Sequence, residues 1–320
     1  MPVYCVTGTN RGIGLEIVRQ LSQSSDNTII ATTRSLSSDL TDLKAVASSS
    51  THILECDTGD VASIRSFVKE AAQTLGGDKK IDFLLNSAGV NLASWQSSLT
   101  LGPDELHTQI SINVIGPAKM VELLLDAGLL SRDVRILNMT SGLGSMQSSL
   151  GIKPRKCAGY SISKAGLNML TVHQSEDLKQ HLPGAVVICM DPGWVKTRMG
   201  GEGAVLEPHE SVGGILRVLH ALKPEDTGSF YLYNGEKCPC LLRLQHRPIH
   251  DAPVVRDLGA KNKAYAISNL ARLREYVDVA ISVTQKTNAR MRSKCCPRIT
   301  SRARELPRTS DEVLPEMERC

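Results

Sequence analysis

The stretch Thr7-Gly8-Thr9-Asn10-Arg11-Gly12-Ile13-Gly14 lies between a short apolar run and a longer amphipathic run. The apolar run, Val3–Thr7, predicts a β-strand, and the amphipathic run, Gly14–Ser24, predicts an α-helix. Three glycines let the backbone of the turn approach a pyrophosphate, and the helix N-terminus offers free N–H groups and a partial positive charge. Their spacing is G-x-x-x-G-x-G, and their position between strand and helix predicts a nucleotide-binding turn.

The same alternation of strand and helix patterns continues to about residue 240. Apolar, β-branched runs predict further strands at Thr28–Thr32, His52–Glu55, Ile81–Asn86, Val134–Thr140, Ala185–Met190 and Phe230–Tyr233. Between them, helices are predicted at Ser63–Leu75, from Pro103 through Asn113 to about Leu130, at Tyr160–His181 and at Glu210–Leu222. This order predicts an α/β fold with a doubly wound parallel sheet in three layers, a Rossmann-type single domain with a C-terminal extension.

Charge divides the chain near residue 240. Residues 1–240 hold 21 Lys+Arg and 24 Asp+Glu, whereas residues 241–320 hold 16 and 9, so the net charge changes from −3 to +7. We therefore expect residues 1–240 to form the catalytic domain and residues 241–320 to form a basic extension, partly helical and then disordered. A helical appendage and a nucleic-acid-binding arm are the alternatives, but the basic residues lack interleaved aromatics, so no nucleic-acid partner is expected.

Composition favours a protein of the cytoplasm. No apolar run reaches the length of a membrane span, and the N-terminus has no basic segment followed by an apolar stretch. None of the nine cysteines has the C-x-x-C spacing of a zinc site, so free thiols are expected and no metal is predicted.

Arginines near the turn favour NADPH over NADH. A site for NADH usually places a carboxylate at the end of the second strand, against the ribose 2′-hydroxyl. Here that strand is followed by Arg34, and Arg11 lies in the turn itself. Both guanidinium groups suit a 2′-phosphate, although two solvated surface arginines would give the same pattern.

Tyr160 and Lys164 lie one turn apart on a predicted helix and therefore share a face. A nearby ammonium favours the phenolate and is expected to lower the pKa of the phenol, which then exchanges a proton with a carbonyl oxygen near neutral pH. Ser141 follows the strand Val134–Thr140, at the sheet edge where ligands bind in open α/β folds. Its hydroxyl is a candidate to hydrogen-bond the substrate oxygen, or else an ordinary turn serine.

Over about residues 3–240 the chain resembles the short-chain dehydrogenase/reductase family. The resemblance is carried, in order, by Thr7–Gly14, Asp57, Asn86-Ser87-Ala88-Gly89, Asn113, Ser141, Tyr160 with Lys164, and Pro192-Gly193 with Thr197. Asn86–Gly89 replaces the more frequent N-N-A-G. The long segment between Ser141 and Tyr160 and the run Asp191–Gly201 resemble the carbonyl reductase and sniffer, or C-factor-like, branch.

The resemblance implies a role for each matching residue. Asn113 would hold a water in a proton relay to Lys164, Tyr160 would protonate the substrate oxygen, and Ser141 would steady it. Lys164 would also bond the nicotinamide ribose. The cofactor would be held by Gly8, Arg11, Gly12, Ile13, Gly14, Asp57, Asn86, Ala88, Gly89, Tyr160, Lys164, Val195 and Thr197, and by Arg34 on the charge argument given above. Asp57 and Asn113 would otherwise be interpreted as a helix cap and an ordinary helix residue.

The resulting hypothesis is an oxidoreductase that transfers hydride from NADP(H) to a neutral ketone or aldehyde, as a monomer or homodimer. Candidate pocket residues are Trp95, Leu143, Met146, Trp194 and Met199, each of which also suits a core, and Met199–Pro208 is predicted to be a mobile lid. A role in secondary metabolism is implied only by the branch it resembles. The rival hypothesis is a catalytically idle NAD(P)-binding sensor or signalling protein.

Overall fold

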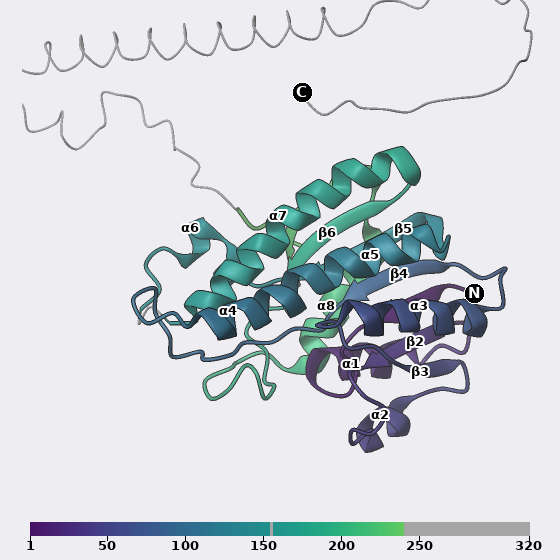
Figure 1. Ribbon diagram of the computed structural model, residues 1–320, viewed down its shortest axis with the longest axis horizontal. Helices are drawn as coiled ribbons and strands as arrows, with labels where there is room; N and C mark the ends of the chain where they lie inside the picture. Colours follow the sequence, from purple (N-terminus) through teal and green to yellow (C-terminus); the bar gives the residue numbers. More distant parts are fainter. Residues whose placement is uncertain (154–155, 240–320) are drawn as a thin grey trace, which may run out of the picture. The chain divides into compact units, whose positions relative to one another are not determined.

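The computed structural model describes residues 1–153 and 156–239 (Figure 1). The predicted domain boundary near residue 240 and the basic extension, residues 241–320, lie outside these residues and stay predictions.

One parallel sheet organises the described part of the chain. Its seven strands lie in the order β3-β2-β1-β4-β5-β6-β7. They are β1 (Val3–Val6), β2 (Thr28–Thr33), β3 (Thr51–Glu55), β4 (Ile81–Asn86), β5 (Leu130–Met139), β6 (Val186–Asp191) and β7 (Phe230–Leu232). The doubly wound parallel sheet that the sequence predicts is thereby confirmed.

Helices cover both faces of this sheet (Figure 1). They are α1 (Gly12–Leu21), α2 (Thr41–Val46), α3 (Val61–Leu75), α4 (Pro103–Ile110), α5 (Gly116–Asp126), α6 (Met146–Ser149), α7 (Ala158–His181) and α8 (Pro208–Ala221). A π-helical turn, η1 (Ser111–Ile115), joins α4 to α5, and two 3₁₀ turns, η2 (Gly142–Gly144) and η3 (Pro224–Asp226), follow β5 and α8.

Strand alternation divides the core into two layers. On β1, Val3 and Cys5 pack in one cluster with residues of α3, α5 and α7, whereas Tyr4 and Val6 pack in the other with residues of α1, α2 and α8. Side chains alternate across a strand, so a strand that is apolar throughout serves both layers. The almost continuous burial of β1, β2 and β6 explains why these strands were readily predicted.

Several elements differ from the prediction, beyond small shifts at strand and helix ends. The single helix predicted from Pro103 to about Leu130 is interrupted by η1 and ends at Asp126. Strand β5 begins at Leu130 rather than Val134, because Leu130 pairs with Ile81 across a register shift that the polar residues 131–133 conceal in the sequence. Helix α2 was not predicted, since it is a single short, mostly polar segment with Leu43 as its buried residue.

Candidate active site

Several segments that carry predicted site residues directly follow the carboxyl ends of strands. Thr7–Gly14 follows β1, Ser87–Gly89 follows β4, Ser141 follows β5 and Pro192–Thr197 follows β6. Beside β1 the strand order changes direction, because β2 and β4 flank it on opposite sides. Open α/β sheets bind ligands at such a switch point.

The glycine turn is as compact as the sequence predicts. Gly8 and Gly12 have φ values of +72° and +59°, which other residues rarely adopt. A Cβ on Gly8 would lie 2.8 Å from the Cα of Ala88, and one on Gly14 would lie 2.3 Å from the carbonyl oxygen of Gly8. The turn therefore packs directly on the segment after β4 and presents bare backbone at the start of α1, where Ile13 is a first-turn residue.

Three guanidinium groups gather beside this turn. Burial, followed by the charges of Arg198 and Arg34, lowers the pKa of Arg11, so Arg11 is close enough to both of the other arginines to be repelled by them. Thr197 lies against the turn as well, since a Cβ on Gly12 would sit 3.5 Å from its methyl group. In the described part of the chain none of these arginines has a carboxylate within 4.0 Å. Such a cluster suits a phosphate group.

Three of the remaining cofactor-binding candidates make hydrogen bonds within the carboxyl edge of the sheet. The buried amide of Asn86 donates to Asn138 Oδ1 at 2.9 Å, so its side chain joins β4 to β5 rather than facing outward. The Ala88 N–H donates to Thr7 Oγ1 at 2.9 Å. Asp57 accepts from the Gly59 N–H at 2.9 Å, whereas the cap of α3 is Asp60, so Asp57 closes a turn and is not the helix cap.

Tyr160, Lys164 and Ser141 lie together at the start of α7. Lys164 Nζ is 5.6 Å from the centre of the Tyr160 ring, and the Ser141 hydroxyl hydrogen-bonds the Tyr160 side chain. The ammonium of Lys164 is buried and donates to the carbonyl oxygen of Met139 at 2.7 Å. Ser141 Oγ also accepts a hydrogen bond from the Leu143 N–H at 3.2 Å, which orients the hydroxyl just after the end of β5.

The expected lowering of the phenol pKa is wrong for this structure. Burial above all, and then the charge of Asp191, raise the pKa of Tyr160, while the hydrogen bond to Ser141 acts in the opposite direction. Burial lowers the pKa of Lys164 to about 8. The site therefore holds a protonated phenol at neutral pH, the form that donates a proton.

Asn113 lies in the π-helical turn η1 and is fully buried. Its side chain accepts from the Val90 N–H and donates to the Val90 carbonyl and to Ser163 Oγ, each at 2.9 Å. A Cβ on Gly89 would lie 3.2 Å from Asn113 Oδ1 and 3.4 Å from Lys164 Nζ. Asn113 thus fastens the segment after β4 against the lysine, and the water relay stays a prediction.

The two ends of the predicted lid, Met199–Pro208, make several contacts with neighbouring residues. Val195 and Leu206 form a β-bridge, Lys196 and Glu207 form an ion pair at 2.5 Å, and Trp194 Nε1 donates to the Gly200 carbonyl at 2.8 Å. Thr197 accepts from the Gly200 N–H at 3.1 Å. These contacts tie both ends of Met199–Pro208 to neighbouring residues, and its mobility stays a prediction.

Four of the five pocket candidates are too exposed to be core residues. Trp95 is 71% exposed, and Met146, Trp194 and Met199 are each more than half exposed. They lie on the segments after β4, β5 and β6, the same edge that carries Tyr160. Their exposure is compatible with a role at the substrate site, which stays a prediction.

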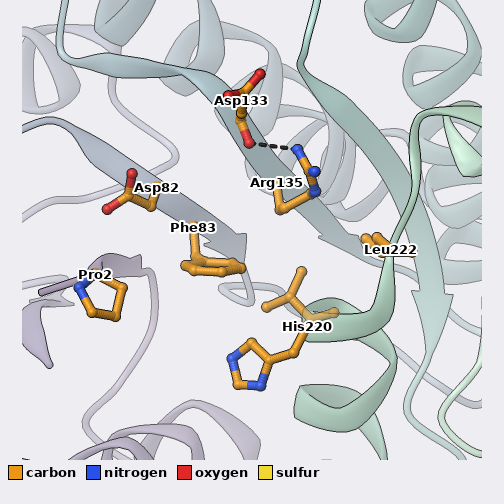
Figure 2. A pocket seen from close by; sticks show the side chains of 8 residues that line it. Pro2, Asp82, Phe83, Asp133, Arg135, His220 and Leu222 are labelled. Carbon is orange, nitrogen blue, oxygen red and sulfur yellow. Dashed lines mark hydrogen bonds between the residues drawn. The ribbon is translucent and has the colours of Figure 1, made fainter. Parts of the chain in front are cut away.

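A separate hollow of about 310 Å³ lies at the opposite edge of the sheet (Figure 2). It is lined at the strand starts and at the end of α8, where Phe83 stacks on Tyr4 with ring centres 4.6 Å apart and Tyr4 hydrogen-bonds His220 at 3.0 Å. None of the predicted site residues lines it. The predicted site residues therefore lie away from this hollow, toward the carboxyl edge of the sheet.

Two residues of this site were not singled out from the sequence. Arg198 joins the arginine cluster, and Asp191 joins Tyr160 and Ser141. Both belong to the run Asp191–Gly201, whose resemblance to the family is the signal that could have identified them. Only the folded chain brings them near residues that are distant in sequence.

In the described part of the chain no helix is long and apolar enough to cross a membrane.

Known proteins resemble the chain in sequence and in structure. The model of the short chain dehydrogenase family matches residues 2–204. A relative named C-signal, from Myxococcus xanthus, is 33% identical over 159 residues, which are 50% of this chain and 92% of that protein.

Two solved structures share the fold. The NADPH-bound carbonyl reductase from chicken fatty liver is 30% identical with a TM-score of 0.67, covering 75% of this chain and 100% of its own. Carbonyl reductase Sniffer of D. melanogaster is 27% identical with a TM-score of 0.66, covering 75% and 99%. Because the family model matches more than half of this chain, the chain belongs to the short chain dehydrogenase family of oxidoreductases.

Proposed function

We propose that this protein reduces a neutral ketone or aldehyde with NADPH. The observation that supports the proposal is the trio of the half-buried Ser141 and Tyr160 with the buried Lys164, at the same sheet edge as the glycine turn. The carbonyl reductases among its structural neighbours, one of them titled as NADPH-bound, support the same reaction.

The residues of the edge fit NADPH. Gly8, Gly12 and Gly14 leave room for a pyrophosphate at the start of α1. Arg34 and Arg198 lie near Arg11, and the three guanidinium groups would supply cationic partners for a 2′-phosphate. Ile13, Asp57, Ala88, Gly89, Val195 and Thr197 would complete the contacts. Bound there, NADPH supplies the hydride that the carbonyl carbon receives.

The chain's own groups handle the oxygen and its proton. The Ser141 hydroxyl donates a hydrogen bond to the carbonyl oxygen and orients it. Tyr160 transfers its phenolic proton to that oxygen as the carbonyl becomes an alcohol, and its raised pKa keeps the proton in place at neutral pH until then. Lys164, held by the Met139 carbonyl, supplies a positive charge beside the phenolate that this transfer leaves. The exposed apolar surface around Trp194 favours an apolar substrate.

The test is a panel of ketones, aldehydes and quinones, assayed with NADPH and NADH side by side. We expect NADPH-dependent turnover, and we expect Tyr160→Phe to lower kcat by at least about 10²-fold, because it removes the general acid. NADPH binding, measured by fluorescence, should stay close to wild type in that variant.

The rival function is a catalytically idle NAD(P)-binding signalling protein, which the name of the C-signal relative suggests. A sensor has no need of a buried lysine beside the phenol. Tight NADPH binding without turnover of any carbonyl on the panel would favour this alternative. A part in secondary metabolism remains a proposal that only the natural substrate can test.

A further inference from the structure

The hollow at the amino edge of the sheet, drawn in Figure 2, is built on a row of in-register side chains. Tyr4 pairs with Phe83 across β1 and β4, and Phe83 pairs with Arg135 across β4 and β5. Because side chains alternate along a strand, residues paired in this way point to the same face of the sheet. On that face the end of α8 completes the lining of the hollow.

Phe83 gives the hollow an aromatic wall. Tyr4 stacks on one face of its ring, with ring centres 4.6 Å apart, and His220 meets the ring edge-on at 5.4 Å. The Tyr4 hydroxyl and His220 Nε2 are hydrogen-bonded at 3.0 Å, which holds the three rings together. Among the described residues no ring or cation stacks on the other face of Phe83. That face is therefore free to accept a flat group.

Arg135 brings an incompletely bonded guanidinium to the hollow. Its Nη1 donates to the Asp133 carbonyl at 2.5 Å and to the Gly184 carbonyl at 3.1 Å. Within the described residues its Nε and Nη2 donate no hydrogen bond, and no carboxylate lies within 4.0 Å of it. A guanidinium presents its N–H donors in a planar fork that matches a carboxylate. The free side of Arg135 therefore suits the carboxylate of a ligand.

The lining also carries negative charge, from Asp82 and Asp133. Asp82 Oδ2 accepts from the Val3 N–H at 2.9 Å, and its Oδ1 has no partner among the described residues. The hollow lies at the C-terminal end of α8 as well, where the helix dipole adds partial negative charge. These groups repel a ligand that is only anionic, and Arg135 repels one that is only cationic. The lining therefore favours a ligand that carries both charges.

We propose that this hollow binds a small zwitterion with an aromatic ring, the chemistry of an aromatic amino acid. The ring lies on the free face of Phe83, the carboxylate is held by the free side of Arg135, and the ammonium faces Asp82. Figure 2 shows Asp82 and Arg135 on either side of Phe83, so one ligand that lies over the ring can reach both charges. The volume of about 310 Å³ suits a small molecule. None of the residues of the proposed active site takes part.

The first experiment needs only the wild-type chain and para-fluorophenylalanine as the probe, observed by fluorine NMR. We expect saturable line broadening with a dissociation constant of about 1 mM, which is ordinary for a ligand of this size. Two analogues test the charges, because para-fluorophenylpropionate lacks the ammonium and para-fluorophenethylamine lacks the carboxylate. Each should bind about tenfold more weakly, since each loses one charge-assisted contact. No saturable binding of the probe, or an equal affinity for either analogue, overturns the inference.

The second experiment locates the probe. Arg135→Met should weaken its binding by about tenfold, and Phe83→Leu by about threefold to tenfold, because stacking contributes less than a charge-assisted hydrogen bond. Arg132→Met is the matched control, since it removes an exposed arginine from the same strand and should leave the affinity unchanged. If Arg135→Met does not fold, Arg135→Lys replaces it, because lysine keeps the charge but loses the planar fork.

Arg11→Ala, in the arginine cluster beside the glycine turn, tests for binding at the carboxyl edge instead. We expect the probe to bind this variant as it binds the wild-type chain. Affinity that is lost in Arg11→Ala, or that is unchanged in both the Arg135 and the Phe83 variants, places the probe elsewhere and overturns the inference. Neither experiment measures turnover, so the result holds whether or not the protein reduces a carbonyl compound.

Discussion

Replacing Lys164 by methionine should stabilise the fold while it removes activity. The ammonium is 3% exposed, and burial lowers its pKa from 10.5 to about 8. At about 1.4 kcal/mol per pKa unit, this lowering corresponds to a desolvation penalty of about 3 kcal/mol at neutral pH. Methionine avoids the penalty but leaves the Met139 carbonyl without its donor, a loss of about 1 kcal/mol. We expect Lys164→Met to be about 2 kcal/mol more stable near pH 7.

The way in which this stability difference changes with pH distinguishes relief of the desolvation penalty from improved packing by the methionine side chain. Below about pH 8 the folded lysine is charged and the whole penalty is present. Between about 8 and 10.5 the unfolded chain keeps a proton that the folded protein has released, so wild-type stability rises with pH relative to the variant. The advantage of Lys164→Met should therefore be largest near neutrality and shrink toward pH 10.

Urea unfolding followed by circular dichroism, without cofactor, measures both free energies. Lys69→Met on α3 is the matched control, since that lysine is exposed and its replacement should change stability by less than about 0.5 kcal/mol. A Lys164→Met variant that is less stable than wild type near pH 7, or whose advantage does not vary with pH, would refute the reasoning.

Two further predictions concern the cofactor edge. Arg198→Ala should weaken NADPH binding about tenfold and NADH binding far less, because one charge-assisted hydrogen bond to a phosphate contributes about 1.5 kcal/mol or more. Arg217→Ala, at an exposed position, is the control. Equal losses of affinity for both nucleotides, or a comparable loss in the control, would exclude Arg198 from the phosphate site. Gly8→Ala should destabilise the fold by more than Gly12→Ala. Both variants place alanine in a left-handed backbone conformation, at a cost of about 1–2 kcal/mol, but only at Gly8 would the new Cβ also lie 2.8 Å from the Cα of Ala88. Thermal unfolding compares the two variants, and equal losses would contradict the packing of the turn on Ala88.

Local pattern carried most of the fold. Strands such as β1 and β2 consist of apolar and β-branched residues that are buried throughout, so their existence follows from local composition, and their parallel pairing follows from the alternation of strands with helices. The start of β5 and the interruption at η1 do not, since a register shift against β4 and a π turn depend on what packs beside them. The short helix α2 has too little apolar surface to leave a pattern.

The sequence by itself determined the nucleotide turn, the family and the trio Ser141, Tyr160 and Lys164, because each depends on residue types at short, recognisable spacings. Only the tertiary structure decided the charge state of that trio. Burial is a property of the packed chain, and it raises the pKa of the phenol, whereas the sequence predicts that the nearby ammonium lowers it. Likewise, Arg198 and Asp191 acquire their neighbours only when the end of β6 is placed beside β5 and the glycine turn, because electrostatic interactions depend on distance in space and not on separation along the chain.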